Sequence, residues 1–299
     1  MTAITVDAMP SIAASETPRR IAKPTARQLE VAAAPSSATE HAAAMRAFFA
    51  AVLPPILGLL LVIGVWHVAT IKGGAIPSPA KTWDAATLLF ADPFYRNGPN
   101  DQGIGWNILA SLQRVGIGFG IAALVGIPAG FLLGRFALLS SLVNPLISLL
   151  RPVSPLAWLP IGLLVFKRAD PAATWTIFIC SIWPMIMNTA QGVQRVPQDY
   201  LNVARVLNLS EWKIVTKILF PSVLPYMLTG IRLSIGTAWL VIVAAEMLTG
   251  GVGIGFWVWD EWNNLKVEHI IIAIFVIGIV GLILEQILLF LAKRLHTES

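Results

Sequence analysis

Long apolar runs separated by short polar segments dominate the sequence from about residue 50 to residue 292. An α-helix needs about 20 apolar residues to cross the roughly 30 Å hydrocarbon layer of a membrane. The runs lack the short alternating pattern of a barrel strand, so the helix is the expected spanning element. We therefore predict an all-α integral membrane protein with six transmembrane helices. The predicted spans cover residues 53–71, 106–134, 138–166, 172–192, 222–247 and 268–292.

The first 46 residues differ from the rest of the chain. They are rich in Ala, Ser, Thr and Pro, with scattered Arg and Lys and no Phe, Trp or Tyr. Such a composition buries too little apolar surface to offset the entropy cost of ordering. We predict a disordered cytoplasmic tail over residues 1–46 and a transmembrane domain over residues 47–299. The first apolar run is of span length, which argues against a secretory signal peptide.

Two local patterns refine this outline. Pro152, Pro155 and Pro160 lie inside the predicted third span, where a missing N–H and a bulky ring disrupt helical hydrogen bonding. We expect that span to bend or break. Residues 79–91 have the spacing of an amphipathic helix in an outward segment, and the turn-rich residues 92–100 follow it.

Composition and charge place the loops relative to the membrane. The chain is 56% hydrophobic and 12% charged, with a mean hydropathy of +0.74, which excludes an ordinary soluble domain. If the N-terminus is cytoplasmic, twelve Lys and Arg residues lie inside, six lie outside and three lie within spans. The positive-inside rule then places both termini and the loop at 193–221 in the cytoplasm. This asymmetry accounts for the net charge of +5, so no nucleic-acid partner is expected.

The loop at 193–221 contains a short amphipathic helix. Pro197 suits a first helical position, and Asn208 tolerates the left-handed conformation of a C-terminal cap. Such a helix either docks on a partner protein or lies on lipid headgroups. Its apolar face is formed at i, i+3, i+4 and i+7 by Tyr200, Val203, Ala204 and Leu207.

The sequence carries none of the common motifs for catalysis. A phosphate-binding loop requires Gly-x-x-x-x-Gly-Lys followed by Ser or Thr, and the sequence contains no such run. Neither a Ser-His-Asp pattern nor metal-ligand spacing is present, and the single cysteine, Cys180, lies in an apolar span. We predict that the chain is not an enzyme and binds no cofactor or metal. Coupling to ATP would then require another subunit.

The loop resembles the EAA motif of permease subunits of ABC importers. In that motif Glu-Ala-Ala is followed after three residues by Gly, and after nine more by Ile-x-Leu-Pro. Ala204, Ile218 and Pro221 match the motif, whereas Asn202, Val203, Asn208 and Phe220 depart from it. The resemblance implies a type I ABC importer permease fold, with a cytoplasmic coupling helix that docks in a groove of an ATPase subunit. The residues assigned to that contact are Asp199, Tyr200, Asn202, Val203, Ala204, Arg205, Leu207, Asn208 and Pro221.

The resemblance covers residues 50–295 and extends to a branch of this family. Residues 151–160, 231–239 and 244–248 are similar to permeases for nitrate, sulfonates, taurine and bicarbonate. The stretches that look specifically like nitrate permeases, whose nearest relatives carry bicarbonate or cyanate, are residues 103–116, 199–207 and 250–262.

These similarities imply a subunit of an ATP-driven importer in the bacterial inner membrane. It would move nitrate, and also nitrite, from periplasm to cytoplasm. The implied partners are a second copy of the chain, two ATPase subunits that bind ATP and Mg, and a periplasmic or lipid-anchored nitrate-binding protein. The alternatives are a permease for bicarbonate, cyanate, sulfonate or taurine, and a stand-alone secondary carrier. The carrier should show two matching halves, and the sequence shows no such duplication.

Nitrate is a planar monoanion, so its pathway should offer cations or hydrogen-bond donors. Charged residues inside spans are the candidates, because they usually face a bundle interior or a cavity. Arg232 is the first choice and Arg151 and Arg114 come next, although Arg114 also fits the outer headgroup level and Arg232 also fits snorkelling. Trp239 fits either a steric gate or interior packing. Glu246 lies near the outer boundary, where a structural or gating ion pair is expected.

Overall fold

The computed structural model describes residues 37–297. The chain forms two compact units, Met1–Gly64 and Val65–Ser299. Helix α2 (Ser37–Thr70) provides the described part of the first unit and continues into the second. All the candidate functional residues belong to the second unit.

Helix α2 begins ten residues before the predicted start of the membrane domain. Residues 37–46, predicted to belong to the tail, form its first turns, and residues 1–36 lie outside the described part of the chain. Alanine is frequent here and has the highest helix propensity, which explains the extension. Within α2, Val52–Thr70 is long and apolar enough to cross a membrane.

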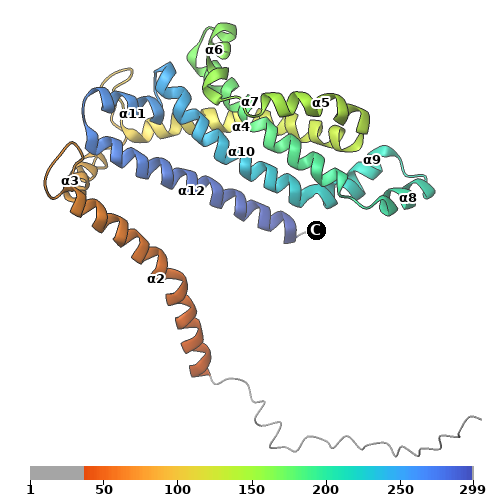
Figure 1. Ribbon diagram of the computed structural model, residues 1–299, viewed down its shortest axis with the longest axis horizontal. Helices are drawn as coiled ribbons and strands as arrows, with labels where there is room; N and C mark the ends of the chain where they lie inside the picture. Colours follow the sequence, from red (N-terminus) through yellow and green to blue (C-terminus); the bar gives the residue numbers. More distant parts are fainter. Residues whose placement is uncertain (1–36, 298–299) are drawn as a thin grey trace, which may run out of the picture. The chain divides into compact units, whose positions relative to one another are not determined.

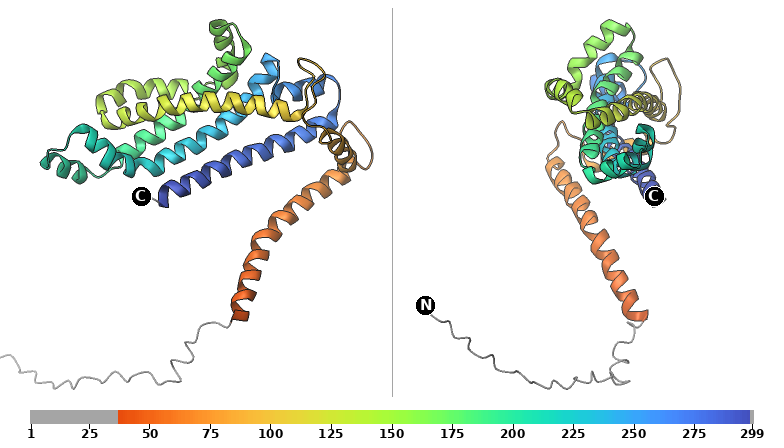
Figure 2. Two further views of the ribbon diagram at one scale, coloured as in Figure 1. Left: turned by 180° about the vertical axis from the view of Figure 1, so that it is seen from behind. Right: turned by 90° about the vertical axis from the view of Figure 1, so that its right-hand side faces the viewer.

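Three long helices of the second unit pack side by side: α4 (Ile104–Arg135), α7 (Ala169–Gln194) and α10 (Phe220–Thr249) (Figure 1, Figure 2). Small residues on α4 allow its backbone to approach α7 closely. A Cβ atom added at Gly130 would lie 2.6 Å from the Thr189 Cβ and 2.7 Å from the Ile186 carbonyl oxygen. The small residues of this stripe are Gly118, Ala122, Gly126, Gly130 and Gly134.

The predicted third span is two helices. α5 (Ala137–Leu150) and α6 (Pro155–Phe166) meet at an angle of 100°, and Pro152 and Pro155 lie at the break. The expectation that prolines break this span is confirmed, whereas a continuous helix over 138–166 is not present.

The remaining elements connect and cover the three central helices. The predicted outward helix is α3 (Pro79–Leu89), which the Ser78 hydroxyl caps. Between α7 and α10 the chain forms α8 (Gln198–Val206), α9 (Glu211–Ile214) and a π-helical turn (Val215–Leu219). After α10 come α11 (Ile254–Asn263) and α12 (Val267–Thr297), and α12 lies alongside α10 (Figure 1).

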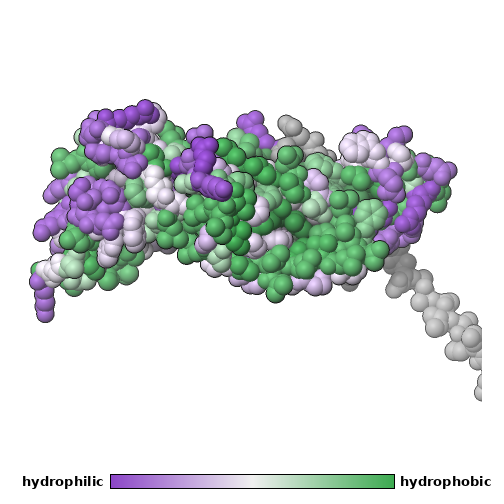
Figure 3. All heavy atoms as spheres, turned by 90° about the horizontal axis from the view of Figure 1, so that it is seen from above, coloured by the Kyte–Doolittle hydropathy of each residue, from purple (hydrophilic) through white to green (hydrophobic). Residues whose placement is uncertain are grey.

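Four helical segments of the described chain are long and apolar enough to span a membrane: Val52–Thr70, Ile104–Arg135, Glu211–Thr249 and Val267–Ala292. The bent α5–α6 pair makes a fifth if it forms one span. α7 occupies the fourth predicted span as a continuous 26-residue helix, but polar residues such as Asn188 and Gln191 lower its hydropathy. On the face shown in Figure 3, hydrophobic side chains gather in the middle and hydrophilic ones at the two ends.

Candidate functional site

Helix α8 forms at the predicted position in the loop between α7 and α10. Pro197 is its N-cap and not its first helical residue. The helix ends where Asn208 adopts a left-handed conformation with φ of 49°. The Leu209 N–H donates to the Ala204 carbonyl at 3.0 Å. The Asn208 N–H donates to the Arg205 carbonyl at 3.0 Å, which completes a Schellman motif. The predicted left-handed cap at Asn208 is confirmed.

The apolar side chains of α8 divide between two sides of the helix. Leu201 and Ala204 are buried in a cluster with residues of the π-helical turn and α10. Ala204 therefore packs inward and does not share the partner-facing side predicted for it, because it lies one turn beyond Leu201. The exposed α8 face includes Tyr200, Val203, Val206 and the adjoining Leu207, whose exposed fractions are 57%, 57%, 83% and 64%.

Polar groups border the exposed α8 face. Asp199, Asn202 and Arg205 are all exposed. The Arg205 Nη1 donates to the Asn202 Oδ1 at 3.1 Å, which orders the pair along one edge. Asp199 lies in the first turn, where a carboxylate interacts favourably with the helix dipole. The surface thus combines an apolar centre with a charged rim, as a protein-docking surface does.

Pro221, the last residue of the segment that resembles the EAA motif, changes the backbone hydrogen bonding at the start of α10. As the second residue of α10 it has no N–H for the Lys217 carbonyl, so the usual helical bond cannot form there. The preceding turn widens, and the Phe220 N–H instead donates to the Val215 carbonyl. Such π-helical turns are frequent at functional sites.

The α8–α9 loop is attached to the central helices by packing and charge. Leu219 and Val223 carry the α8 cluster into α10. At the end of α4, the Arg135 Nη2 lies 3.3 Å from the Glu211 Oε1 of α9. A force on α8 would therefore reach both α4 and α10.

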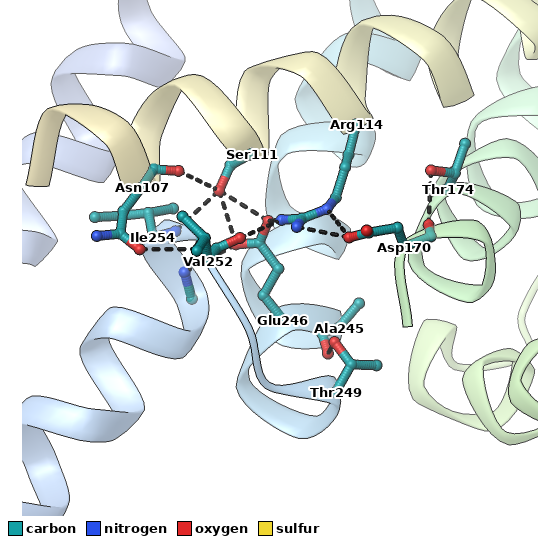
Figure 4. Close-up of polar contacts among 12 residues, drawn as sticks. Asn107, Ser111, Arg114, Asp170, Thr174, Ala245, Glu246, Thr249, Val252 and Ile254 are labelled. Atoms are coloured by element: carbon teal, nitrogen blue, oxygen red, sulfur yellow. Dashed lines mark hydrogen bonds and ion pairs between the residues drawn. The ribbon is translucent and has the colours of Figure 1, made fainter. Parts of the chain in front are cut away.

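A polar network joins α4, α10 and the glycine-rich turn before α11, at the other end of the central helices (Figure 4). Glu246 lies at its centre and is 1% exposed. Its carboxylate accepts hydrogen bonds from the Ser111 hydroxyl at 2.7 Å and from the Gly255 N–H at 3.0 Å. Ser111 also accepts from the Ile254 N–H at 2.9 Å, and the Asn107 side-chain oxygen accepts from the Gly253 N–H at 2.9 Å. The turn is thus held by side chains of α4.

Arg114 completes this network. Its Nη1 donates to the Glu246 Oε1 at 2.6 Å and to the Val252 carbonyl at 2.7 Å. Its Nε and Nη2 contact the Asp170 Oδ1 at 2.9 and 2.7 Å. Two carboxylates and a carbonyl occupy the guanidinium, which disfavours Arg114 as an anion contact. The ion pair expected for Glu246 is present, and Arg114 is its partner.

The first-choice pathway residue also has a partner. The Arg232 Nε donates to the Glu285 Oε1 of α12 at 2.8 Å, and the Nη2 contacts the same oxygen. Trp239 lies two turns further along α10, where its indole N–H donates to the Ile277 carbonyl at 2.9 Å. Arg232, Trp239 and Glu285 line one cavity. The structure thus brings together two predicted residues, Arg232 and Trp239. Glu285, whose position in the predicted sixth span favours a buried ion pair or a contact between two copies of the chain, forms an ion pair with Arg232; sequence spacing does not reveal which helix supplies the partner.

Arg151 lies elsewhere. It is the exposed residue that ends α5, at the corner with α6. Neither Arg232 nor Arg114 shares its surroundings, so the three arginines form no single cluster.

A polar pocket of about 390 Å³ lies between the segment at 95–102 and α11. One wall is Glu261, whose Oε2 lies 2.8 Å from the His269 Nδ1 and 3.5 Å from the Lys266 Nζ. The His269 ring stacks on Trp257. Burial alone would raise the pKa of Glu261, but the hydrogen bond and charge of His269 and the charge of Lys266 outweigh it, so the pKa is lowered. On the opposite wall, burial and the neighbouring Asp101 carboxylate raise the pKa of Tyr95.

Comparison with known proteins identifies the class of this arrangement. Residues 126–297 match the family described as binding-protein-dependent transport system inner membrane component, and this match covers more than half of the chain. The chain belongs to this family. The matched region includes α7, the α8–α9 loop and α10, together with Glu246 and Glu285.

Named relatives agree with this membership. The nitrate import permease protein NrtB of Leptolyngbya laminosa is 46% identical over 83% of this chain and 88% of its own length. The bicarbonate transport system permease protein CmpB of a Synechocystis strain is 46% identical over 81% of this chain and 88% of its own length. Such relatives are transport components and not enzymes, as predicted for this chain.

A solved structure supports the fold. A chain of the MetNI methionine ABC transporter in an inward-facing conformation aligns with a TM-score of 0.53 and 16% sequence identity. The alignment covers 64% of this chain and 94% of that chain. The predicted type I ABC importer permease fold is confirmed.

Proposed function

We propose that this chain is the membrane-spanning subunit of an ATP-driven importer that moves nitrate, and also nitrite, from periplasm to cytoplasm. The observation that carries the proposal is the 46% identity to a nitrate import permease over 83% of the chain. The equal identity to a bicarbonate permease makes bicarbonate the second candidate. Both ions are small planar oxyanions, so one pathway chemistry suits either.

The proposed assembly contains two copies of this chain, two ATPase subunits that bind ATP and Mg, and a periplasmic or lipid-anchored nitrate-binding protein. The exposed α8 face is the surface proposed to enter a groove of the ATPase. An exposed apolar patch with a charged rim, attached to α4 and α10, supports this role because it can transmit motion to the core.

The proposed topology has six spans, with α5 and α6 together forming the third and α7 the fourth. α7 is long enough to cross a membrane at about 1.5 Å per residue, and its polar side chains can be satisfied by the helices that flank it. Both termini and the α8–α9 loop are placed in the cytoplasm of a bacterial inner membrane. The excess of Lys and Arg on that side supports this orientation.

Uptake by the assembled complex decides between the two oxyanions. Proteoliposomes containing this chain and its ATPase subunits would receive labelled nitrate or bicarbonate in the presence of the cognate binding protein and internal ATP. The proposal predicts uptake of nitrate that unlabelled nitrite competes with and excess bicarbonate leaves unchanged. Bicarbonate uptake with no nitrate uptake would assign the chain to the second candidate.

A further inference from the structure

A half-exposed ion pair lies within two candidate membrane spans. Arg232 belongs to the segment Glu211–Thr249 and Glu285 to the segment Val267–Ala292. Their side chains are 52% and 36% exposed. Exposed charges within a span are costly against lipid, so they face either a polar cavity or another protein surface.

The pair borders two cavities between α10 and α12. Arg232 and Glu285 line a cavity of about 380 Å³ between α10 and α12. A second cavity of about 280 Å³ along the same two helices also has Thr229 and Arg232 in its wall. Arg232 is therefore common to both. One turn further, Gly236 leaves open space, since an added Cβ atom would meet nothing within 4 Å.

The pair leaves hydrogen-bonding capacity unused. A guanidinium has five N–H donors, and the carboxylate of Glu285 engages the Nε and Nη2 groups through one oxygen, Oε1. A guanidinium binds a carboxylate most strongly when two oxygens are engaged in parallel. Nitrate and bicarbonate present the same planar pair of oxygens as a carboxylate, so either anion can engage the Arg232 guanidinium through two oxygens where Glu285 uses one.

We propose that Arg232 binds the oxyanion in transit and that Glu285 is its displaceable counter-ion. This inference rests on the proposed function. Without substrate, Glu285 neutralises Arg232 and keeps the guanidinium oriented toward the cavity. An arriving anion takes over the guanidinium and repels the carboxylate of Glu285. The returning carboxylate then competes with the anion and speeds its release, which keeps the affinity low enough for transport.

Equilibrium binding tests this exchange directly. The complex of this chain and its ATPase subunits, in lipid nanodiscs without the binding protein, is titrated with labelled nitrate. Glu285→Gln removes the competing charge and should tighten nitrate binding by at least about tenfold. Arg232→Gln should abolish saturable binding. Gln286→Leu, at the next residue of α12 and outside both cavities, should match the wild type.

Two further variants separate an anion site from a structural pair. In the neutral double variant Arg232→Gln/Glu285→Gln, a structural pair would recover wild-type behaviour, whereas the proposal predicts no nitrate binding. Gly236→Leu fills the cavity without changing a charge and should also abolish binding. The proposal is wrong if both single variants weaken binding alike, if the double variant restores it, or if Glu285→Gln binds no nitrate.

Uptake measurements distinguish this inference from the proposed function. If the wild-type complex imports nitrate and Arg232→Gln imports it equally well, the inference fails and the function stands. If the wild-type complex imports no nitrate with its binding protein, the proposed function itself fails.

Discussion

The two carboxylates that bind Arg114 offer a test of how burial controls an ion pair. Glu246 and Asp170 both lie within 3 Å of the same guanidinium, but their side chains are 2% and 65% exposed. Glu246→Gln removes the charge, and its amide NH2 replaces one of the two oxygens, so it opposes either the Arg114 Nη1 or the Gly255 N–H donor. Asp170→Asn removes a charge that water already screens.

The expected free-energy changes differ severalfold. Removing one partner of a buried pair costs about 3–5 kcal/mol. Arg114 retains Asp170 in the Glu246→Gln variant, so we expect the lower end, about 3 kcal/mol. An exposed pair contributes about 0–1 kcal/mol, which is the expectation for Asp170→Asn.

Reversible unfolding in mixed detergent and SDS micelles measures both changes under the same conditions. If burial makes Glu246 the dominant partner, Glu246→Gln should lower the free energy of unfolding by at least about 2 kcal/mol more than Asp170→Asn does. Equal losses, or a larger loss for Asp170→Asn, would refute the argument that burial makes Glu246 the dominant partner.

Three other predictions concern packing, pH and docking. Gly130→Ala should destabilise the fold by about 1–3 kcal/mol because its Cβ meets α7, whereas Gly120→Ala, with open space around it, should be neutral or stabilising in the same unfolding assay. Since the pKa of Glu261 is lowered from 4.5, its contribution to stability is present above pH 4.5 and lost as pH falls through the lowered pKa. Glu261→Gln should therefore flatten the acid side of the stability profile, and a profile parallel to the wild type would exclude this role. Val203→Asp should weaken co-purification of the ATPase on the order of 10–100-fold without loss of folding, and undiminished co-purification would remove Val203 from the contact.

Local backbone chemistry explains why parts of the fold were predictable. The prolines between α5 and α6 break the span wherever it lies, because the missing N–H is a property of the residue itself. The left-handed cap at Asn208 was predictable because tolerance of that backbone conformation is also a property of the residue itself. The inward position of Ala204 was not predictable, since the apolar arc of α8 includes both its buried and its exposed sides. Only the packing of Leu201 against α10 separates them.

The ion pairs depend on contacts between distant segments. Arg114 meets Glu246 across 132 positions, and Arg232 meets Glu285 across 53. A single sequence shows that these charges lie within apolar runs, which is why they were chosen as candidates. Which arginine is fully occupied and which retains free donors depends on the helix packing. The pair of Glu261 and His269 is by contrast local, with its members eight positions apart across the turn between α11 and α12.

The central claim is that the chain carries an anion only when an ATPase drives it. Proteoliposomes with the binding protein present should accumulate labelled nitrate against its gradient when the ATPase subunits and ATP are included. They should show no uptake when this chain is reconstituted alone. Nitrate moving down its gradient through the chain alone would contradict the account and indicate a stand-alone carrier.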